Sequence, residues 1–303
     1  MRIFVTGASG WIGSAVVAEL IASGHAVVGL ARSDASAGAL AAAGAEVQRG
    51  TLDDLDVIGA AADKSDGVIH LAFKHDLAFT GDFQGAAQAD RHAVDAFGEV
   101  LAGSDRPLVI ASGVLGLSPG HLFTEEDGHA VNPALPPGPQ ARWATAEFTL
   151  SLADRGVRSS IVRLSPTCHG DGDNGFMATL VGIARDTGIS GYIGDGSNRW
   201  PAVHRLDAAH LFCVALEKAP AGSTLHGVAE EGVMTRDIAE VIGRHLDVPV
   251  VSVDPADAGH FSFLAHFFGL DCPASSTITR ELLDWQPTRP GLLEDLDRGH
   301  YFG

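Results

Sequence analysis

The sequence predicts an α/β protein built on a doubly wound parallel sheet, with a smaller C-terminal domain. Short apolar strands alternate with helical segments from the first residues onward, which is the pattern of a parallel sheet covered by helices on both faces. A glycine-rich turn joins the first strand to the first helix. The length of 303 residues suits one large α/β unit or about two domains.

The first strand and the first helix define a candidate nucleotide site. Residues 2–6 are apolar and β-branched, and residues 11–23 form an amphipathic segment that stops at Gly24. The turn between them reads T-G-A-S-G-W-I-G. A dinucleotide pyrophosphate needs one glycine for the turn, one for close approach of the phosphates and one for helix–strand packing, beside a helix N-terminus. The predicted contacts are Gly7, Ser9, Gly10, Trp11, Ile12 and Gly13. The alternative is a glycine-rich turn without a ligand.

The end of the second strand, residues 26–31, decides between the two nicotinamide cofactors. An acidic residue there holds the ribose 2′-hydroxyl of NAD, whereas an arginine accommodates the 2′-phosphate of NADP. This chain places Arg32 and Ser33 there, a planar guanidinium and a hydroxyl donor. We therefore expect NADP(H) rather than NAD(H). Two alternatives remain: Asp34 turned inward toward the ribose of NAD, or Arg32 as a solvated surface charge.

The alternation continues along the chain. The pattern predicts helices over 34–43, 83–102, 140–152 and 235–246, and strands over 45–48, 67–72, 107–111, 160–164 and 248–253. The aromatic stretch 261–268 is interpreted as core, with a substrate lid as the alternative. We assign residues 1–170 with 201–225 to a dinucleotide-binding domain, and residues 171–200 with 226–303 to a substrate domain.

Several stretches resemble the extended short-chain dehydrogenase/reductases, a family that includes nucleotide-sugar epimerases and dihydroflavonol-type reductases. They are T-G-A-S-G-W-I-G, H-L-A-F at 70–73, R-L-S-P-T-C-H-G at 163–170, G-D-G-S-N-R-W-P-A-V-H-R-L-D-A-A at 194–209 and S-S-T-I-T-R-E-L-L-D-W-Q-P at 275–287. The resemblance spans nearly the whole chain. It implies a Rossmann sheet and a nicotinamide cofactor.

The resemblance also implies roles for individual residues. The turn at 50–55 is similar to the adenine-side turn of the family, which makes Leu52 and Asp53 candidate adenine contacts, with a helix N-cap as the alternative for Asp53. The backbone after the fourth strand lines the cofactor, at Leu71, Ala72 and Phe73. Ser112 is the candidate for binding the substrate carbonyl, although a gap-free match to the family's Ser-Ser-x-x-Val-Tyr-Gly puts Ala111 in that place. Arg199 matches an arginine that grips substrate phosphate, the alternative being a loop arginine paired with an acid. His204 is a substrate-site candidate that also fits a crossover between domains.

The chain departs from the family at the catalytic helix. The family acid is a tyrosine whose pKa is lowered by a lysine four residues on. This sequence has lysines only at 64, 74 and 218, and no Tyr-x-x-x-Lys. Trp143 and Glu147 occupy that spacing with the wrong chemistry. Arg142 can orient a substrate but is a poor proton donor. His169 and His75 are the candidate replacement acids, because histidine titrates near neutrality; a structural role is the alternative for each.

Composition excludes several classes of partner. The formal net charge of −18 and the absence of a basic run argue against nucleic acid and anionic membranes. The sequence contains no run of eighteen apolar residues, so we predict no membrane span. Cys168, Cys213 and Cys272 are widely spaced, so the sequence predicts neither a disulfide framework nor a metal site. Because the first strand starts at Arg2, we expect no signal peptide and a cytoplasmic location.

The leading hypothesis is an NADP(H)-dependent oxidoreductase or epimerase-like enzyme that acts on a carbonyl or hydroxyl of a small molecule, with a proton donor other than tyrosine. The second hypothesis is a non-catalytic NADP(H)-binding sensor or scaffold, which loss of the Tyr–Lys pair favours. An isomerase or lyase with a tightly held cofactor stays open. A closed pocket with a titratable group favours the enzyme, whereas a cleft blocked by Trp143 favours the sensor. A homodimer through the helices at 83–102 and 140–152 is implied by the resemblance.

Overall fold

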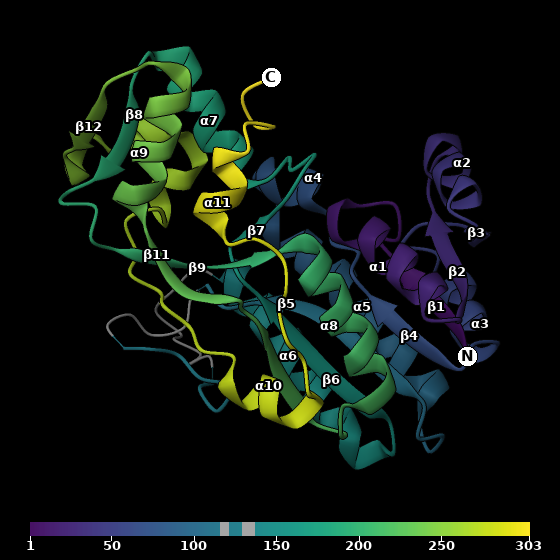
Figure 1. Ribbon diagram of the computed structural model, residues 1–303. Helices are drawn as coiled ribbons and strands as arrows, with labels where there is room; N and C mark the ends of the chain where they lie inside the picture. The colour runs from purple at the N-terminus through teal and green to yellow at the C-terminus, as the bar shows by residue number, and fades with distance from the viewer. Residues whose placement is uncertain (116–120, 129–136) are drawn as a thin grey trace.

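The computed structural model describes residues 1–115, 121–128 and 137–303, and its centre is a seven-stranded parallel sheet (Figure 1). The strand order is β10-β6-β5-β4-β1-β2-β3. This order confirms the predicted doubly wound sheet, because the chain moves outward in one direction from β1 and then returns to build the other half from β4. The strands are β1 (Arg2–Thr6), β2 (Ala26–Ala31), β3 (Glu46–Arg49), β4 (Gly67–His70), β5 (Pro107–Gly113), β6 (Arg158–Leu164) and β10 (Ser223–Gly227).

Helices cover both faces of this sheet because consecutive strand side chains point to opposite sides. In β1, Ile3 and Val5 pack into one core and Phe4 packs into the other. The first core includes residues of α1 (Trp11–Ala22), α2 (Asp34–Ala42) and α8 (Arg205–Lys218). The second includes residues of α3 (Leu55–Asp63), α5 (Phe83–Leu101) and α6 (Pro137–Ser151). Two short elements, α4 (His75–Phe79) and η1 (Leu152–Arg155), follow β4 and α6.

A smaller body lies beyond the carboxyl ends of the strands (Figure 1). One three-stranded sheet joins β7 (Thr167–His169), β9 (Arg199–His204) and β11 (Glu230–Met234), and a parallel pair joins β8 (Ser190–Ile193) and β12 (Val250–Val253). The helices are α7 (Phe176–Thr187), α9 (Thr235–Leu246), η2 (Pro255–His266), α10 (Thr277–Leu283) and α11 (Leu292–Asp297). Phe261 and Phe268 are buried in its core with Trp200, as the core interpretation of this stretch predicts.

One predicted strand boundary shifts for an identifiable reason. The strand expected from 248 begins at Val250, because Pro249 has no N–H to give to the ladder. The short strand β7 pairs with residues 202–204 of β9, which fall in the same predicted domain as β7. The division into 1–170 with 201–225 and 171–200 with 226–303 stays a prediction. Among the described residues, no helix combines the length and apolar character needed to cross a membrane.

The C-terminal segment returns to the large sheet through one buried carboxylate. Asp207, in the first turn of α8, accepts hydrogen bonds from the backbone N–H groups of Thr288 and Arg289 at 3.0 and 2.9 Å. The indole N–H of Trp285 donates to the Asp207 carbonyl at 3.1 Å. Trp285 is fully buried in the core beside α1 and α8. These contacts therefore attach the C-terminal segment to α8 and to the large sheet.

Candidate functional site

The glycine turn is held by contacts that only glycine permits. Gly7 has φ +66°, and a Cβ there would lie 2.7 Å from the backbone nitrogen of Ala72. A Cβ on Gly13 would lie 2.0 Å from the Gly7 carbonyl oxygen. The first glycine therefore lets β1 approach the segment after β4, and the third lets α1 pack onto the turn, which are the two roles expected from the spacing.

The N-terminus of α1 is open to an anion. Gly10 is its N-cap and supplies no side-chain hydrogen bond, and the first turn of α1 has no acidic residue. Ser9 and Gly10 are exposed, and Trp11 and Ile12 are half-buried. Uncapped N–H groups and the positive end of the helix dipole favour a phosphate at this point. The turn lies between β1 and β4, where the strand order reverses and ligands bind in sheets of this type.

The Arg205 side chain lies beside this helix end. The Arg205 guanidinium stacks on the Trp11 indole, with its central carbon 4.1 Å from the ring centroid, and donates to the Ser14 hydroxyl at 3.0 Å. The Trp11 N–H in turn donates to the Cys168 carbonyl at 3.1 Å. Sequence reasoning missed Arg205, because it lies in α8, far along the chain from the glycine turn.

A series of buried hydrogen bonds holds the backbone next to the glycine turn in place. The Thr6 hydroxyl lies 2.6 Å from His70 Nδ1, and His70 Nε2 lies 3.1 Å from an Asp90 carboxylate oxygen. The backbone N–H of Ala72 donates to the Thr6 hydroxyl at 3.3 Å, and that of Leu71 donates to the Thr6 carbonyl at 3.2 Å. These bonds fix the backbone of Leu71 and Ala72 beside Gly7. The signal in the sequence was Asp90, an acid on the apolar face of the helix predicted over 83–102.

The end of β2 is followed by an exposed arginine. The Arg32 side chain is 71% exposed and lies 3.1 Å from an Asp76 carboxylate oxygen at the start of α4. Asp34 is fully exposed and lies 2.6 Å from Arg49, so it does not turn inward toward a ribose. The Ser33 hydroxyl accepts from the Ser36 N–H at 3.2 Å and caps α2, which gives it a structural partner besides any phosphate.

The predicted adenine contacts have partners of their own. The Leu52 side chain is buried in the core on the α3 and α5 face of the sheet. Asp53 pairs with Lys74, whose ammonium lies 2.7 Å from both carboxylate oxygens. The Leu52 side chain is therefore not available to an adenine.

The segment after β4 contacts α6 through Phe73 and Arg142. The Arg142 guanidinium stacks over the Phe73 ring at 4.2 Å, and the Phe73 and His75 ring centroids are 5.1 Å apart. The structure thus brings together three predicted site residues from two distant stretches of sequence. Burial lowers the His75 pKa, and the positive charge of Arg142 lowers it further. Burial also lowers the pKa of Arg142 itself. Trp143 follows Arg142 and is half-buried.

Ser112 is the second-last residue of the strand β5, in register with Arg163 of β6, and is 5% exposed. It is therefore placed at the carboxyl edge of the sheet, where a substrate is expected.

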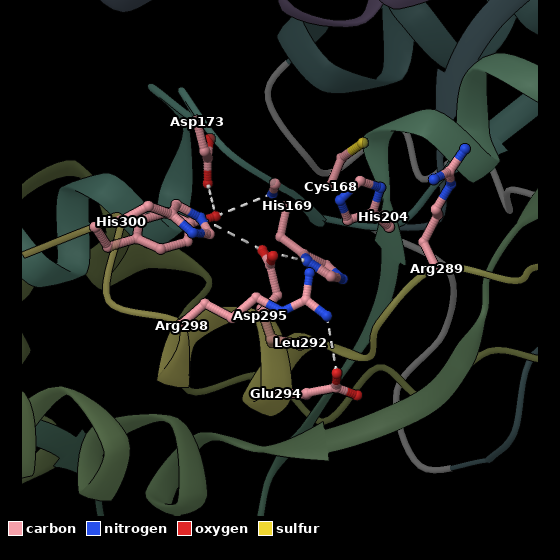
Figure 2. Close-up of polar contacts among 12 residues, drawn as sticks. Cys168, His169, Asp173, His204, Arg289, Leu292, Glu294, Asp295, Arg298 and His300 are labelled. Atoms are coloured by element: carbon pink, nitrogen blue, oxygen red, sulfur yellow. Dashed lines mark hydrogen bonds and ion pairs between the residues drawn. The ribbon is translucent and has the colours of Figure 1, made fainter.

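His169 is placed in the interior. Its side chain has no exposed surface, and Nδ1 lies 3.0 Å from Asp295 of α11 (Figure 2). Figure 2 shows this carboxylate between His169 and His300. A fully buried ring cannot donate a proton to a substrate in this arrangement, so the geometry favours the structural alternative that the sequence left open.

His204 and Arg199 also have structural partners. His204 Nδ1 accepts from the Leu206 N–H at 3.2 Å and caps α8, and burial lowers its pKa. Arg199 forms a two-bond pair with Asp271, at 3.1 Å from Nε and 2.9 Å from Nη2, and this pair holds the pKa of Asp271 low. For Arg199 the structure shows the ion-pair alternative rather than a free phosphate-binding side chain.

Tyr301 does not replace the missing family tyrosine. Its hydroxyl lies 3.0 Å from an Asp173 carboxylate oxygen and accepts from the Gly170 N–H at 3.1 Å. Burial raises the Tyr301 pKa, and the charge of Asp173 raises it further. A catalytic tyrosine needs the opposite shift, so Tyr301 serves to tie the C-terminus to the loop after β7.

Comparison with known proteins agrees with this arrangement. Residues 3–84 match the NAD dependent epimerase/dehydratase family. The chain is 46% identical over 303 residues to an uncharacterized protein of Schizosaccharomyces pombe, with 100% of both chains covered. It is 27% identical over 252 residues to the sterol-4-alpha-carboxylate 3-dehydrogenase, decarboxylating, of Dictyostelium discoideum, covering 78% of this chain and 73% of that protein.

Solved structures share the fold at low sequence identity. The UDP-glucose 4-epimerase of Thermotoga maritima, crystallised with UDP-glucose, superposes with a TM-score of 0.77 at 18% identity, covering 100% of this chain and 98% of that one. The dTDP-glucose 4,6-dehydratase of Bacillus anthracis, in complex with NAD, gives a TM-score of 0.76 at 17% identity, covering 99% and 95%.

Proposed function

The chain belongs to the NAD dependent epimerase/dehydratase family, and from this premise we propose that it is an NADP(H)-dependent oxidoreductase acting on a carbonyl or hydroxyl of a small molecule. The observation that carries the proposal is the open N-terminus of α1 behind the Gly7 turn, flanked by Arg205. A pyrophosphate fits there because uncapped N–H groups and a guanidinium converge on it without an opposing acid in the first turn.

Preference for the phosphorylated cofactor rests on Arg32. Its guanidinium is exposed at the end of β2, while Asp34, the residue that would favour NAD, is held by Arg49. A 2′-phosphate there would compete with Asp76 for Arg32, and a doubly charged phosphate is the stronger partner. The B. anthracis dehydratase, which has a similar fold, was solved in complex with NAD. The fold alone therefore does not fix the cofactor, and our preference for NADP(H) depends on the charge of Arg32.

The bound cofactor would supply hydride at its nicotinamide ring, and the protein would supply orientation and a proton. We place the substrate between Ser112 at the end of β5 and the group formed by Phe73, His75 and Arg142. Ser112 would hold the substrate oxygen, and the Arg142 cation would orient it. His75 would exchange the proton, since His169 is fully buried and Tyr301 is paired with Asp173.

A non-catalytic NADP(H) sensor is the second candidate, favoured by Trp143 and Glu147 at the spacing of the family's tyrosine and lysine. A sensor would bind coenzyme without oxidising or reducing anything.

The free thiols of Cys168, Cys213 and Cys272 fit a reducing compartment such as the cytosol for either function.

The test is a panel of aldehydes and ketones offered with NADPH, followed by the loss of nicotinamide absorbance. We expect turnover with at least one carbonyl compound, and a fall in kcat of about 10²-fold in His75→Asn, as loss of a general acid–base gives. His169→Asn is the matched histidine control and should retain kcat wherever it folds. Tight NADPH binding without turnover of any compound would contradict the enzyme hypothesis and favour the sensor hypothesis.

A further inference from the structure

A histidine, a cysteine and a glutamate meet where the turn after α1 packs on α8. His25 Nε2, Cys213 Sγ and a Glu217 carboxylate oxygen all lie within 4.8 Å of one another. The His25 and Glu217 atoms are 2.9 Å apart. Within residues 1–115, 121–128 and 137–303, no other three His, Cys, Asp or Glu side chains converge in this way.

The fold explains why these residues converge. Figure 1 shows α1 and α8 side by side on one face of the sheet. Cys213 and Glu217 are four residues apart on α8, so their side chains share one face of the helix. His25 directly precedes β2, whereas the glycine turn directly follows β1, and the two strands are parallel. The cluster therefore lies at the amino edge of the sheet, at the end opposite the glycine turn.

We propose that His25, Cys213 and Glu217 bind a divalent transition metal of the Zn²⁺ type, with water at the fourth position. One thiolate, one imidazole and one carboxylate are ligand types that zinc accepts. Tetrahedral bonds of the usual lengths would put the ligand atoms about 3.4–3.6 Å apart, which small rotamer changes reach from the present positions. The metal would insert between His25 and Glu217 in place of their direct contact.

The cluster is sheltered, and one cation already lies beside it, since the Met1 ammonium is 3.5 Å from His25 Nδ1. The Cys213 side chain is buried, His25 is 7% exposed and Glu217 is 36% exposed, so the site is sheltered with one open side. Glu19 and His210, 2.7 Å apart, form the next pair along the seam between α1 and α8. Burial raises the Cys213 pKa, so metal binding would release the thiol proton.

Co²⁺ titration of the full-length, untagged protein tests the proposal, because a cobalt–thiolate bond has a charge-transfer absorption that histidine and carboxylate ligands lack. We expect this absorption to saturate at one Co²⁺ per chain, to disappear on addition of Zn²⁺, and to be lost in Cys213→Ser. Cys272→Ser, which removes another buried free thiol in the small body, is the matched control and should keep it. Glu217→Gln should weaken Co²⁺ binding at least about tenfold, since even outer partners of metal ligands matter at that level.

Thermal unfolding supplies a second readout. Zn²⁺ should raise the Tm of the wild type and of Cys272→Ser but leave Cys213→Ser unchanged. Far-ultraviolet circular dichroism reports whether each variant is folded. No thiolate absorption in the wild type, or an equal absorption in folded Cys213→Ser, would overturn the proposal and leave the three residues as a hydrogen-bonded surface cluster.

Discussion

At the level of single residues, two ion pairs join loops at the carboxyl edge of the sheet. Arg32 faces Asp76, and Lys74 faces Asp53. Both pairs join the segment after β4 to the loops after β2 and β3. An exposed pair such as Arg32–Asp76 contributes about 0–1 kcal/mol to stability. We therefore expect a coenzyme phosphate to displace Asp76 from Arg32, because it would form the stronger charge-assisted bond.

Arg32→Ala is expected to weaken NADPH binding by about 10- to 100-fold while leaving NADH binding within about twofold. The loss corresponds to roughly 1.5–3 kcal/mol for hydrogen bonds from a guanidinium to a phosphate. Fluorescence titration with both coenzymes measures it. Arg155→Ala, which removes another exposed arginine paired with an acid, is the control. An equal loss for NADPH and NADH would show that Arg32 does not read the 2′-phosphate.

Gly13→Ala is expected to abolish coenzyme binding and to lower the free energy of unfolding by about 1–3 kcal/mol or more. The added Cβ would lie 2.0 Å from the Gly7 carbonyl oxygen, so the turn must shift. Gly38→Ala is the matched control, because its Cβ meets nothing within 4 Å in α2. It should instead stabilise the protein by about 0.5–1 kcal/mol. Chemical denaturation and NADPH titration measure both effects; normal NADPH affinity in Gly13→Ala would contradict the account.

Single residues show where sequence reasoning stops. The position of Arg32 at the end of β2 was predictable, because a strand end is defined by local pattern, and its role toward NADP(H) stays a prediction. The partners of His169 and Arg199 were not predictable, because Asp295 and Asp271 are distant in sequence and only folding brings them close. Arg205 was missed for the same reason. Local signals predict which residue stands at a turn, but they do not predict what faces it.

At the scale of elements, α8 connects three parts of the molecule. Its N-cap is His204, its first turn anchors the tail through Asp207, and its last turns carry Cys213 and Glu217. The helix is buried on several sides, between α1, the sheet and the tail. A change at one end of α8 is therefore felt in a segment that is remote in sequence.

Asp207→Ala is expected to lower the free energy of unfolding by about 2–4 kcal/mol. The substitution leaves the N–H groups of Thr288 and Arg289 without their acceptors and loosens the tail. Urea denaturation measures the change. Asp186→Ala, at an exposed position in α7, should stay within about 0.5 kcal/mol of the wild type. A similarly small effect in Asp207→Ala would mean that the tail is held by Trp285 alone.

Elements with strong periodicity were predictable almost to the residue. The helix expected over 235–246 is α9, and the helix expected over 83–102 ends one residue earlier. Their apolar spacing and caps are local properties. The strand β7 has three residues, too few for a period, so its partner in the small sheet was set by tertiary packing and not by its own sequence.

Over the whole molecule, buried histidines make stability depend on pH. Burial lowers the pKa values of His204, His226 and His260 below the unfolded value of about 6.5. The folded protein then binds fewer protons than the unfolded chain. Their contribution to stability is complete above pH 6.5 and is lost as the pH falls through the folded pKa values.

We expect the free energy of unfolding to fall between about pH 7 and pH 5, and His226→Gln to flatten the profile. Each such histidine contributes up to about 1.4 kcal/mol per pH unit. His226 is fully buried, with Nδ1 2.7 Å from the Ser275 carbonyl oxygen. Urea unfolding at intervals of half a pH unit measures the slope. His121→Gln, at an exposed histidine, should leave it unchanged; an identical slope in His226→Gln would contradict the assignment.

The overall architecture was the most predictable level, because alternation of strands and helices leaves few topologies for a parallel sheet. The family resemblance extended that prediction over the second half of the chain. The cluster of His25, Cys213 and Glu217 is the counter-example, since His25 is distant in sequence from the other two and only the packing of α1 on α8 brings it close to them. The homodimer through the helices at 83–102 and 140–152 stays a prediction, which sedimentation of the purified protein would check.

The central claim is that the glycine turn at the end of β1 binds the pyrophosphate of a nicotinamide nucleotide, with Arg32 adding preference for the 2′-phosphate. Calorimetric titration of the wild-type protein with NADPH and with NADH tests it most directly. The account predicts saturable heat at one coenzyme per chain, with NADPH the tighter ligand. Absence of heat with both coenzymes would contradict the site itself, and tighter binding of NADH would contradict the role of Arg32.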